Sequence, residues 1–288
     1  MKSLWSKQKR FAYALTFPIS VVLLGLLIFP LIFSVYISTM STAAGLQKLQ
    51  FVGLRNYKEV FTSSIFFNSV KNTVIFVLAT VSTTTIVGFS IALLLNDIKR
   101  CAGIFRTLLI TPLAIAPVVA GLTWGMMFNP LFGVVNYLLG FLGIPPLGWA
   151  TEIKTALITI IIIDTWQWTP FMMIILYAGI QMIPVETYEA ARIDGANRLQ
   201  EIIYITIPLL KPIFIIALIF RVMDAFRSFD IIYTVTRGGP GNATETIVIR
   251  AYLASIKYHR LEIGAVIGII LLIITFIVSK YALKAMPK

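Results

Sequence analysis

The chain has 288 residues, of which 58% are hydrophobic and only 12% are charged, and its formal net charge is +12. Soluble globular proteins carry roughly 25% charged residues, so this composition excludes an ordinary soluble domain. Excess lysine and arginine are typical of the cytoplasmic segments of membrane proteins, and we therefore expect no nucleic-acid partner. Cys101 is the one cysteine, expected in a cytoplasmic loop, and His259 is the one histidine, expected in an exposed loop. A single cysteine excludes a disulfide within the chain. One cysteine and one histidine together leave no Cys/His metal cluster and give no basis for a histidine-dependent catalytic triad.

In chain order, six apolar runs are about as long as the roughly 20 residues that cross a bilayer as a helix. The predicted spans are residues 11–37, 70–95, 108–128, 156–181, 213–235 and 263–283. The expected fold class is therefore an all-α integral membrane protein with six transmembrane helices. The first run is longer than the apolar part of a signal peptide, which is about 7–15 residues, so we predict that it is retained.

Basic residues set the predicted orientation. A cluster of lysine and arginine at residues 2–10 directly precedes the first span. Because such clusters stay in the cytoplasm, both termini are predicted to be cytoplasmic. The segments that then lie outside are 38–69, 129–155 and 236–262. The last of these opens with a glycine- and proline-rich turn.

The longest predicted cytoplasmic segment, residues 182–212, is also the most highly charged part of the chain. Glu186 and Glu189 follow Pro184, and acidic residues in a first turn suit the positive end of a helix dipole. Gly195 permits a sharp change of direction. We therefore predict a short helix, a glycine turn and a second helical stretch at the membrane surface. A plain loop with a glycine helix cap is the alternative.

This segment resembles the EAA motif of binding-protein-dependent ABC importer permeases. The matching positions are Glu189-Ala190-Ala191, Asp194-Gly195-Ala196, Ile207-Pro208 and Pro212. Residues 51–57, 166–171 and 236–240 are similar to the carbohydrate-uptake branch of that family, and within it to the MalF-like rather than the MalG-like subunit. The large periplasmic insertion of the maltose subunit is absent here.

The resemblance implies a type I ABC importer permease (MetI-like) fold that moves a sugar or an oligosaccharide by alternating access. The implied partners are a second, MalG-like permease subunit, two ATP-binding-cassette ATPase subunits and an extracytoplasmic solute-binding protein. The assembly would work at a bacterial or archaeal cytoplasmic (inner) membrane, and this chain would contact the membrane lipid. The residues assigned to ATPase coupling are Glu186, Glu189, Ala190, Ala191, Asp194, Gly195 and Ala196. No GxxxxGK[ST] phosphate loop occurs, so this chain is predicted to be non-catalytic and without a cofactor, while the ATPase subunits bind ATP and magnesium.

The expected domain organisation has two parts. Residues 1–69 form the N-terminal transmembrane helix and an external segment. Residues 70–288 form a five-helix permease core with the coupling loop at 182–212.

Charged side chains at mid-membrane cost about 2.5–3.5 kcal/mol on insertion scales and mark a pathway or an ion pair. At 1.5 Å per residue, Asp164 lies roughly 15 Å from Lys154, and Arg221 roughly 15 Å from Lys211, so both are predicted near the midplane. Each belongs to a polar arc of its helix, mixed with aromatic or small residues. A carbohydrate has hydroxyl groups and an apolar ring face that suit such arcs. The candidate substrate-binding residues are Asp164, Gln167, Trp168, Phe171, Arg221, Asp224, Ala225 and Ser228.

Other interpretations stay open from the sequence. Arg221 and Asp224 are three residues apart and could form a structural ion pair, as could Arg227 with Asp224 or Asp230. The charges also allow a charged solute, for example one of the glycerol-phosphate type. A secondary transporter is less favoured, because the sequence shows no paired glycine or proline interruptions in its spans. A membrane enzyme is less favoured because no acid–base or metal constellation has ligand spacing.

Overall fold

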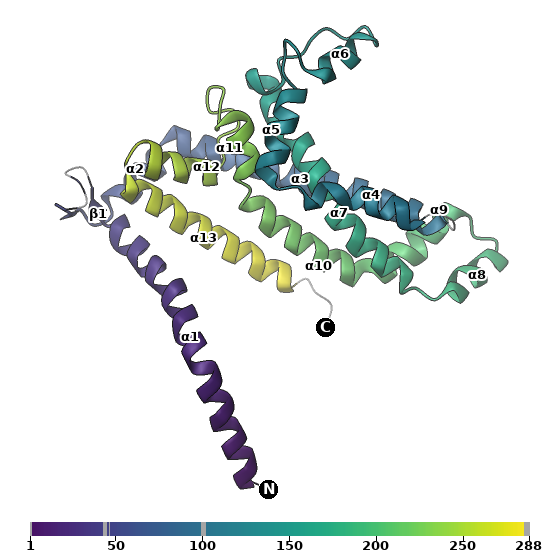
Figure 1. Cartoon of the computed structure of the whole chain (residues 1–288), viewed down its shortest axis with the longest axis horizontal. Coiled ribbons are helices and arrows are strands. Elements are labelled where there is room, and N and C mark those ends of the chain that lie inside the picture. Colours follow the sequence, from purple (N-terminus) through teal and green to yellow (C-terminus); the bar gives the residue numbers. More distant parts are fainter. Residues whose placement is uncertain (1, 43–44, 46, 99–101, 285–288) are drawn as a thin grey trace. The chain divides into compact units, whose positions relative to one another are not determined.

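The computed structural model describes residues 2–42, 45, 47–98 and 102–284, so Cys101 lies outside the described residues. The described chain is mostly helical (Figure 1). The longer helices are α1 (Lys2–Ser38), α3 (Ser64–Asp97), α4 (Ala102–Ala114), α5 (Pro117–Met127), α7 (Ile153–Gln181), α10 (Ile207–Phe226) and α13 (Leu261–Lys284). The shorter helical elements are α2 (Arg55–Thr62), α6 (Val134–Gly140), η1 (Trp149–Thr151), α8 (Val185–Ile193), α9 (Arg198–Glu201), η2 (Ile202–Thr206), α11 (Asp230–Thr236), α12 (Ile247–Tyr252) and η3 (Leu253–Lys257). Strands β1 (Met40–Ser41) and β2 (Gln50–Phe51) pair antiparallel, with Met40 opposite Phe51.

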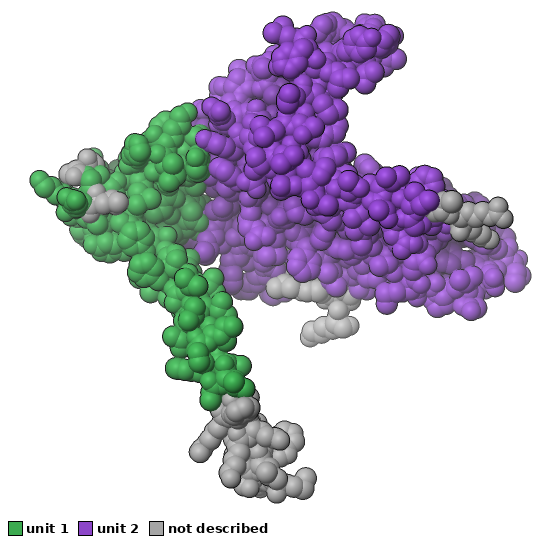
Figure 2. Space-filling view, viewed as in Figure 1, with its two compact units in different colours: residues 1–63, 251–270 green, residues 64–250, 271–288 purple. Residues whose placement is uncertain are grey.

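The chain divides into two compact units, which Figure 2 shows in different colours. Unit 1 comprises residues 1–63 and 251–270, and unit 2 comprises residues 64–250 and 271–288. The first unit thus includes a C-terminal segment that the sequence-based division after residue 69 did not place there. That division concerned the roles of the two parts, and it stays a prediction.

Unit 2 is built around α3, α7 and α10, which approach one another closely at glycines. A methyl group on Gly88 of α3 would lie 2.7 Å from Met172 Cβ on α7. One on Gly179 of α7 would lie 2.7 Å from Leu210 Cδ2 on α10. Small residues allow this approach, and van der Waals packing is a main attraction between helices in a membrane. The fully buried residues of the resulting core are Ala92, Met172, Leu176, Leu210 and Ala217.

The helices confirm the predicted all-α membrane fold. Among the described residues, five helices are long and apolar enough to cross a membrane, and the bent pair of α4 and α5 makes a sixth if it is one span. The predicted spans at 11–37, 70–95, 156–181 and 263–283 coincide with α1, α3, α7 and α13. The other two predicted spans differ from the structure.

The predicted span at 108–128 is wrong as a single helix, because α4 and α5 meet at an angle of 96°. Pro117 begins α5, and a proline disfavours helical geometry at the residue before it, here Ala116 with ψ 135°. Such a break frees backbone groups that must find new partners in a membrane. The side-chain amide of Gln167 on α7 donates to the carbonyl oxygen of Ile115 at 2.8 Å and satisfies one of them.

The predicted span at 213–235 is wrong at both ends. The helix begins at Arg198 in α9 and continues through the π-helical turn η2 into α10. Across this turn the N–H of Ile207 donates to Ile202 O, so the hydrogen bonding is rearranged just before a proline that has no N–H. At the other end α10 stops at Phe226, and α11 begins at Asp230 after a non-helical break.

Candidate functional site

The predicted coupling loop forms a helical hairpin of α8, a turn and α9. Gly195 in the turn has φ +85°, a left-handed conformation that favours glycine. The N–H of Ala196 donates to Ala191 O at 2.9 Å and closes the end of α8. Asn197 then caps α9, because its side chain accepts from the N–H of Gln200. The predicted order of helix, glycine turn and second helix is confirmed.

Most of the candidate coupling residues are exposed on this hairpin. Ala191 and Ala196 are half-buried, and the exposed ones are Glu186, Glu189, Ala190, Asp194 and Gly195. Carboxylates beside small side chains suit a protein partner that approaches closely and offers arginine or lysine. Their role in coupling stays a prediction.

A group of charges at the base of the hairpin was missed in the sequence analysis. Glu201, only 3% exposed, accepts from Arg192 Nε at 2.6 Å and from Arg198 Nη1 at 3.2 Å. The hydrogen bond from Arg192 to Glu201 raises the pKa of the Arg192 guanidinium. Arg198 also donates to both carboxylate oxygens of Asp97 at the end of α3, at 2.5 and 2.7 Å. Arg192 and Glu201 flank the glycine turn, so charge pairing across the hairpin could have revealed them, whereas Asp97 carries no local signal.

The second candidate site is a polar centre between α7, α10 and α3. Arg221 and Asp164 are both fully buried, and Arg221 Nη2 forms an ion pair with Asp164 Oδ1. Arg221 Nη1 lies 3.4 Å from Asp224 Oδ2, and its Nε lies 3.4 Å from Thr84 Oγ1 on α3. The Trp168 ring faces the guanidinium, with the arginine Cζ 5.6 Å from the ring centroid. The structure therefore brings together Asp164, Trp168, Arg221 and Asp224 from the two predicted polar arcs.

The remaining candidates come from the same two predicted arcs, on α7 and at or just after the end of α10. Gln167 and Ala225 are each 2% exposed. Phe171 packs edge-on against Trp168 with ring centroids 6.2 Å apart. Ser228 is half-buried in the break after α10. Of these four residues, Phe171 contacts a member of the centre, whereas the Gln167 amide donates to Ile115 O.

Access to the polar centre differs between its members. Asp224 is 32% exposed, and Trp168 and Phe171 are half-buried, whereas the ion pair of Asp164 and Arg221 is fully buried. Among the described residues, Asp164 Oδ2 and Gln167 Oε1 are buried without a hydrogen-bond partner. Direct solute binding by any of these residues stays a prediction.

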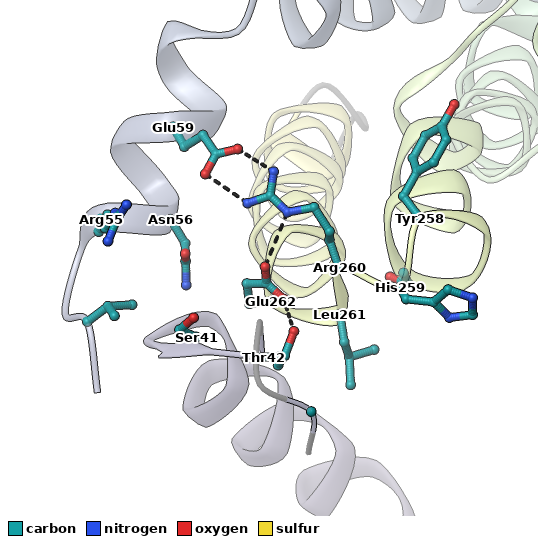
Figure 3. Close-up of a pocket in the computed structure, with 13 residues that line it drawn as sticks. Ser41, Thr42, Arg55, Asn56, Glu59, Tyr258, His259, Arg260, Leu261 and Glu262 are labelled. Carbon is teal, nitrogen blue, oxygen red and sulfur yellow. Dashed lines mark hydrogen bonds and ion pairs between the residues drawn. The ribbon is translucent and has the colours of Figure 1, made fainter. Parts of the chain in front are cut away.

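Unit 1 contains a cavity of about 970 Å³ between α2, β1 and the start of α13. Figure 3 shows that three of its charged side chains pair with one another: Glu59 accepts from Arg260 at 2.5 and 2.8 Å, and Arg260 Nε donates to Glu262 at 3.3 Å. Thr42 donates to the other oxygen of Glu262. The hydrogen bond from Arg260 lowers the pKa of the Glu59 carboxyl. His259 is exposed, as predicted. These pairs join α2 to the start of α13.

The predicted glycine- and proline-rich turn at 238–241 is present and is followed by a segment that packs on α3, whereas its external position stays a prediction. The side-chain amides of Asn68 and Asn72 donate to Asn242 O at 3.0 and 2.9 Å. Glu245 is 2% exposed, and burial raises the pKa of its carboxyl. Asparagines of α3 thus fix the position of this segment within unit 2.

We predict that Asp164→Leu lowers stability, because it leaves the Arg221 charge buried without its partner. Breaking a buried pair in this way typically costs about 3–5 kcal/mol, whereas replacing both partners by apolar residues is often neutral. The double variant Asp164→Leu/Arg221→Met should therefore recover most of the loss. Thermal unfolding of the purified complex in detergent measures both changes. Asp224→Leu is the control, since that carboxylate is partly exposed. Equal stability of the parent and the Asp164→Leu single variant would contradict the assignment.

Comparison with known proteins places the chain in a family. The family of binding-protein-dependent transport system inner membrane components matches residues 84–286. The trehalose/maltose transport system permease protein MalF of Thermococcus litoralis is 39% identical over 267 residues, which cover 92% of this chain and 89% of that protein. The sn-glycerol-3-phosphate transport system permease protein UgpA of Agrobacterium fabrum is 33% identical over 100% of this chain and 98% of its own length.

The fold is also similar to a solved structure. It matches a chain of the bacterial alginate ABC transporter in complex with an alginate pentasaccharide-bound periplasmic protein. The TM-score is 0.84 at 23% identity, over 97% of this chain and 95% of that one. The EAA-type hairpin, the membrane helices and these similarities agree, and the chain belongs to the family of binding-protein-dependent transport system inner membrane components.

Proposed function

We propose that this permease imports a sugar or an oligosaccharide as the MalF-like subunit of an ATP-driven transporter. The observation that carries the proposal is the exposed hairpin of α8 and α9 on a chain whose long helices are apolar. A carrier that worked alone would need no such projection. The choice of a sugar is supported by the trehalose/maltose permease, which is 39% identical over 92% of this chain.

The proposed assembly follows from two features of this chain. Its sequence has no phosphate loop, and it carries an exposed hairpin that an ATPase could bind. A second, MalG-like permease subunit would complete the translocation pathway. Two ATP-binding-cassette subunits would receive the hairpins and would bind ATP and magnesium, since the sequence has no phosphate loop. This chain would then be non-catalytic and hold no cofactor. A solute-binding protein would deliver the solute on the external face of the inner membrane.

In the proposed mechanism, ATP binding moves the hairpins and thereby shifts the membrane helices between outward-open and inward-open states. The solute would contact Trp168 and Asp224 of the polar centre, together with Phe171 and Ser228 of the same predicted arcs. The ring face of a sugar suits the aromatic side chains, and its hydroxyl groups suit the carboxylate and the serine. The buried Asp164–Arg221 pair would fix the positions of these groups.

A charged solute is the second candidate. The exposed guanidinium of Arg227 favours an anionic solute, as does the similarity to a glycerol-3-phosphate permease. A panel of neutral sugars and sugar or glycerol phosphates, tested for stimulation of ATP hydrolysis by the reconstituted complex with its binding protein, distinguishes the two. Stimulation by phosphorylated solutes alone would reject the neutral sugar.

We predict that Trp168→Ala raises the KM of uptake roughly tenfold, which corresponds to about 1.4 kcal/mol of lost binding energy. Trp168→Phe keeps an aromatic face and should retain most of the affinity. Uptake by proteoliposomes, with complex assembly and basal ATP hydrolysis as controls, measures the effect. If the alanine variant keeps the parental KM, the solute passes elsewhere.

We predict that Glu189→Lys and Gly195→Ala each reduce solute-stimulated ATP hydrolysis. The first reverses the charge offered to a partner cation, and losing a charge-assisted hydrogen bond costs about 1.5–3 kcal/mol. The second forces a side chain into a left-handed conformation, at a cost of roughly 1–2 kcal/mol. Glu152→Lys, an exposed charge reversal on the predicted external face, is the matched control. Normal coupling in both hairpin variants would exclude docking through this hairpin.

Both termini are proposed to be cytoplasmic. Lys154 before the apolar part of α7 and Lys211 in α10 are both exposed and lie on opposite predicted sides. In a Cys101→Ser background, a membrane-impermeant thiol reagent should label Lys154→Cys in intact cells and Lys211→Cys only after lysis. The reverse pattern would invert the topology.

A further inference from the structure

We propose that the coupling hairpin acts on the membrane helices through the cytoplasmic end of α3, with Asp97 and Arg198 as positioning residues. The inference rests on the proposed function, because it assumes that an ATPase moves the hairpin. It adds an element outside the EAA motif, since Asp97 lies 101 residues before Arg198 in the sequence.

Two consecutive residues of α3 bind the last residue of α7 and the first residue of α9, on either side of α8. Where α7 ends and the chain enters the hairpin, the Gln181 amide donates to Asn96 Oδ1 at 2.6 Å. Where the second helix of the hairpin begins, Arg198 Nη2 donates to both oxygens of Asp97. The hairpin therefore cannot change its direction without displacing the end of α3 or breaking one of these contacts.

Ion pairs and a hydrogen bond join α8 to α9 and η2, so the hairpin moves as one rigid unit. Glu201 joins Arg192 of α8 to Arg198 of α9, and the hydroxyl groups of Tyr188 and Thr206 lie 3.0 Å apart across the same gap. A guanidinium group has a planar set of donors, so it fixes orientation as well as distance. Arg198 is shared between Glu201 and Asp97, and thus connects the hairpin to α3.

Helix α3 connects the contact between Asp97 and Arg198 to the polar centre. It is one continuous helix, and Thr84 lies 13 residues before Asp97, a distance of about 20 Å along the axis. Thr84 contacts Arg221, and between the two positions Gly88 packs against Met172 of α7. A displacement of the cytoplasmic end of α3 is therefore carried to the buried ion pair.

The contact between Asp97 and Arg198 can be removed without unfolding the protein. Their side chains are 53% and 44% exposed, and an exposed ion pair contributes little to stability. The substitution Asp97→Ala should therefore leave the complex assembled. What it changes is the transfer of movement from the hairpin to α3.

Spin labels in the reconstituted complex test this directly, with a non-hydrolysable ATP analogue as the probe. In a Cys101→Ser background, one label replaces the exposed Val185 on α8 and another the exposed Leu94 on α3. In the parent, the analogue should change the spectra of both labels. In Asp97→Ala, the α8 label should still respond and the α3 label should lose its response. Asp97→Glu, which keeps a carboxylate, should restore it, and Lys211→Ala, which removes an unrelated charge, should not disturb it.

The outcomes separate the inference from the proposed function. A silent α8 label in the parent complex would reject coupling through the hairpin, and the inference with it. A responding α8 label together with an unchanged α3 response in Asp97→Ala would overturn the inference alone. Failure of Asp97→Glu to restore the response would also overturn it, since the carboxylate would not be the group that matters.

Discussion

The buried charge of Arg221 is the constraint on which the centre of the permease depends. An arginine without exposed surface requires a counter-charge and further polar contacts, because an isolated charge in an apolar interior is very unfavourable. Asp164 supplies the charge from α7, Thr84 a hydroxyl from α3, and Trp168 an aromatic face. One side chain thus fixes the relative positions of three membrane helices. The half-buried side chains of Trp168 and Asp224, which contact Arg221, are held in place by the same interaction.

Much of the fold could be predicted from hydrophobicity alone. Runs such as 70–95 and 156–181 are long, apolar and free of prolines near their ends, and the structure contains helices over both. The two failures occur at prolines and at charges. Pro117 breaks a run that contains no charged residue, and the π-turn before Pro208 continues a helix where proline normally ends one. Neither outcome is visible in hydropathy, because both depend on where the freed backbone groups find partners.

The candidate sites also contain features that the sequence predicted and contacts that it did not. Counting residues from each membrane face placed Asp164 and Arg221 at one depth, and the structure pairs them. The hairpin followed from local signals, namely acidic residues, a glycine and helical spacing. Contacts between distant segments, such as Gln167 with Ile115 and Arg198 with Asp97, left no pattern in the sequence. A charged or amide side chain has many possible partners, and only the packing of the helices selects one.

The glycine at position 88 limits how this chain can change shape. A methyl group at this position would stand only 2.7 Å from Met172 Cβ, so α3 and α7 are in close contact here, and sliding either helix would bring a larger side chain into this place. Packed interfaces of this kind switch between discrete arrangements or move together, and they do not deform continuously. Around Gly88, transport must then move α3 and α7 together, whereas the end of α3 at Asp97 lies nine residues beyond this contact. The bending falls on the places where the backbone is already interrupted, at the Ile115–Ala116 break and at residues 227–229.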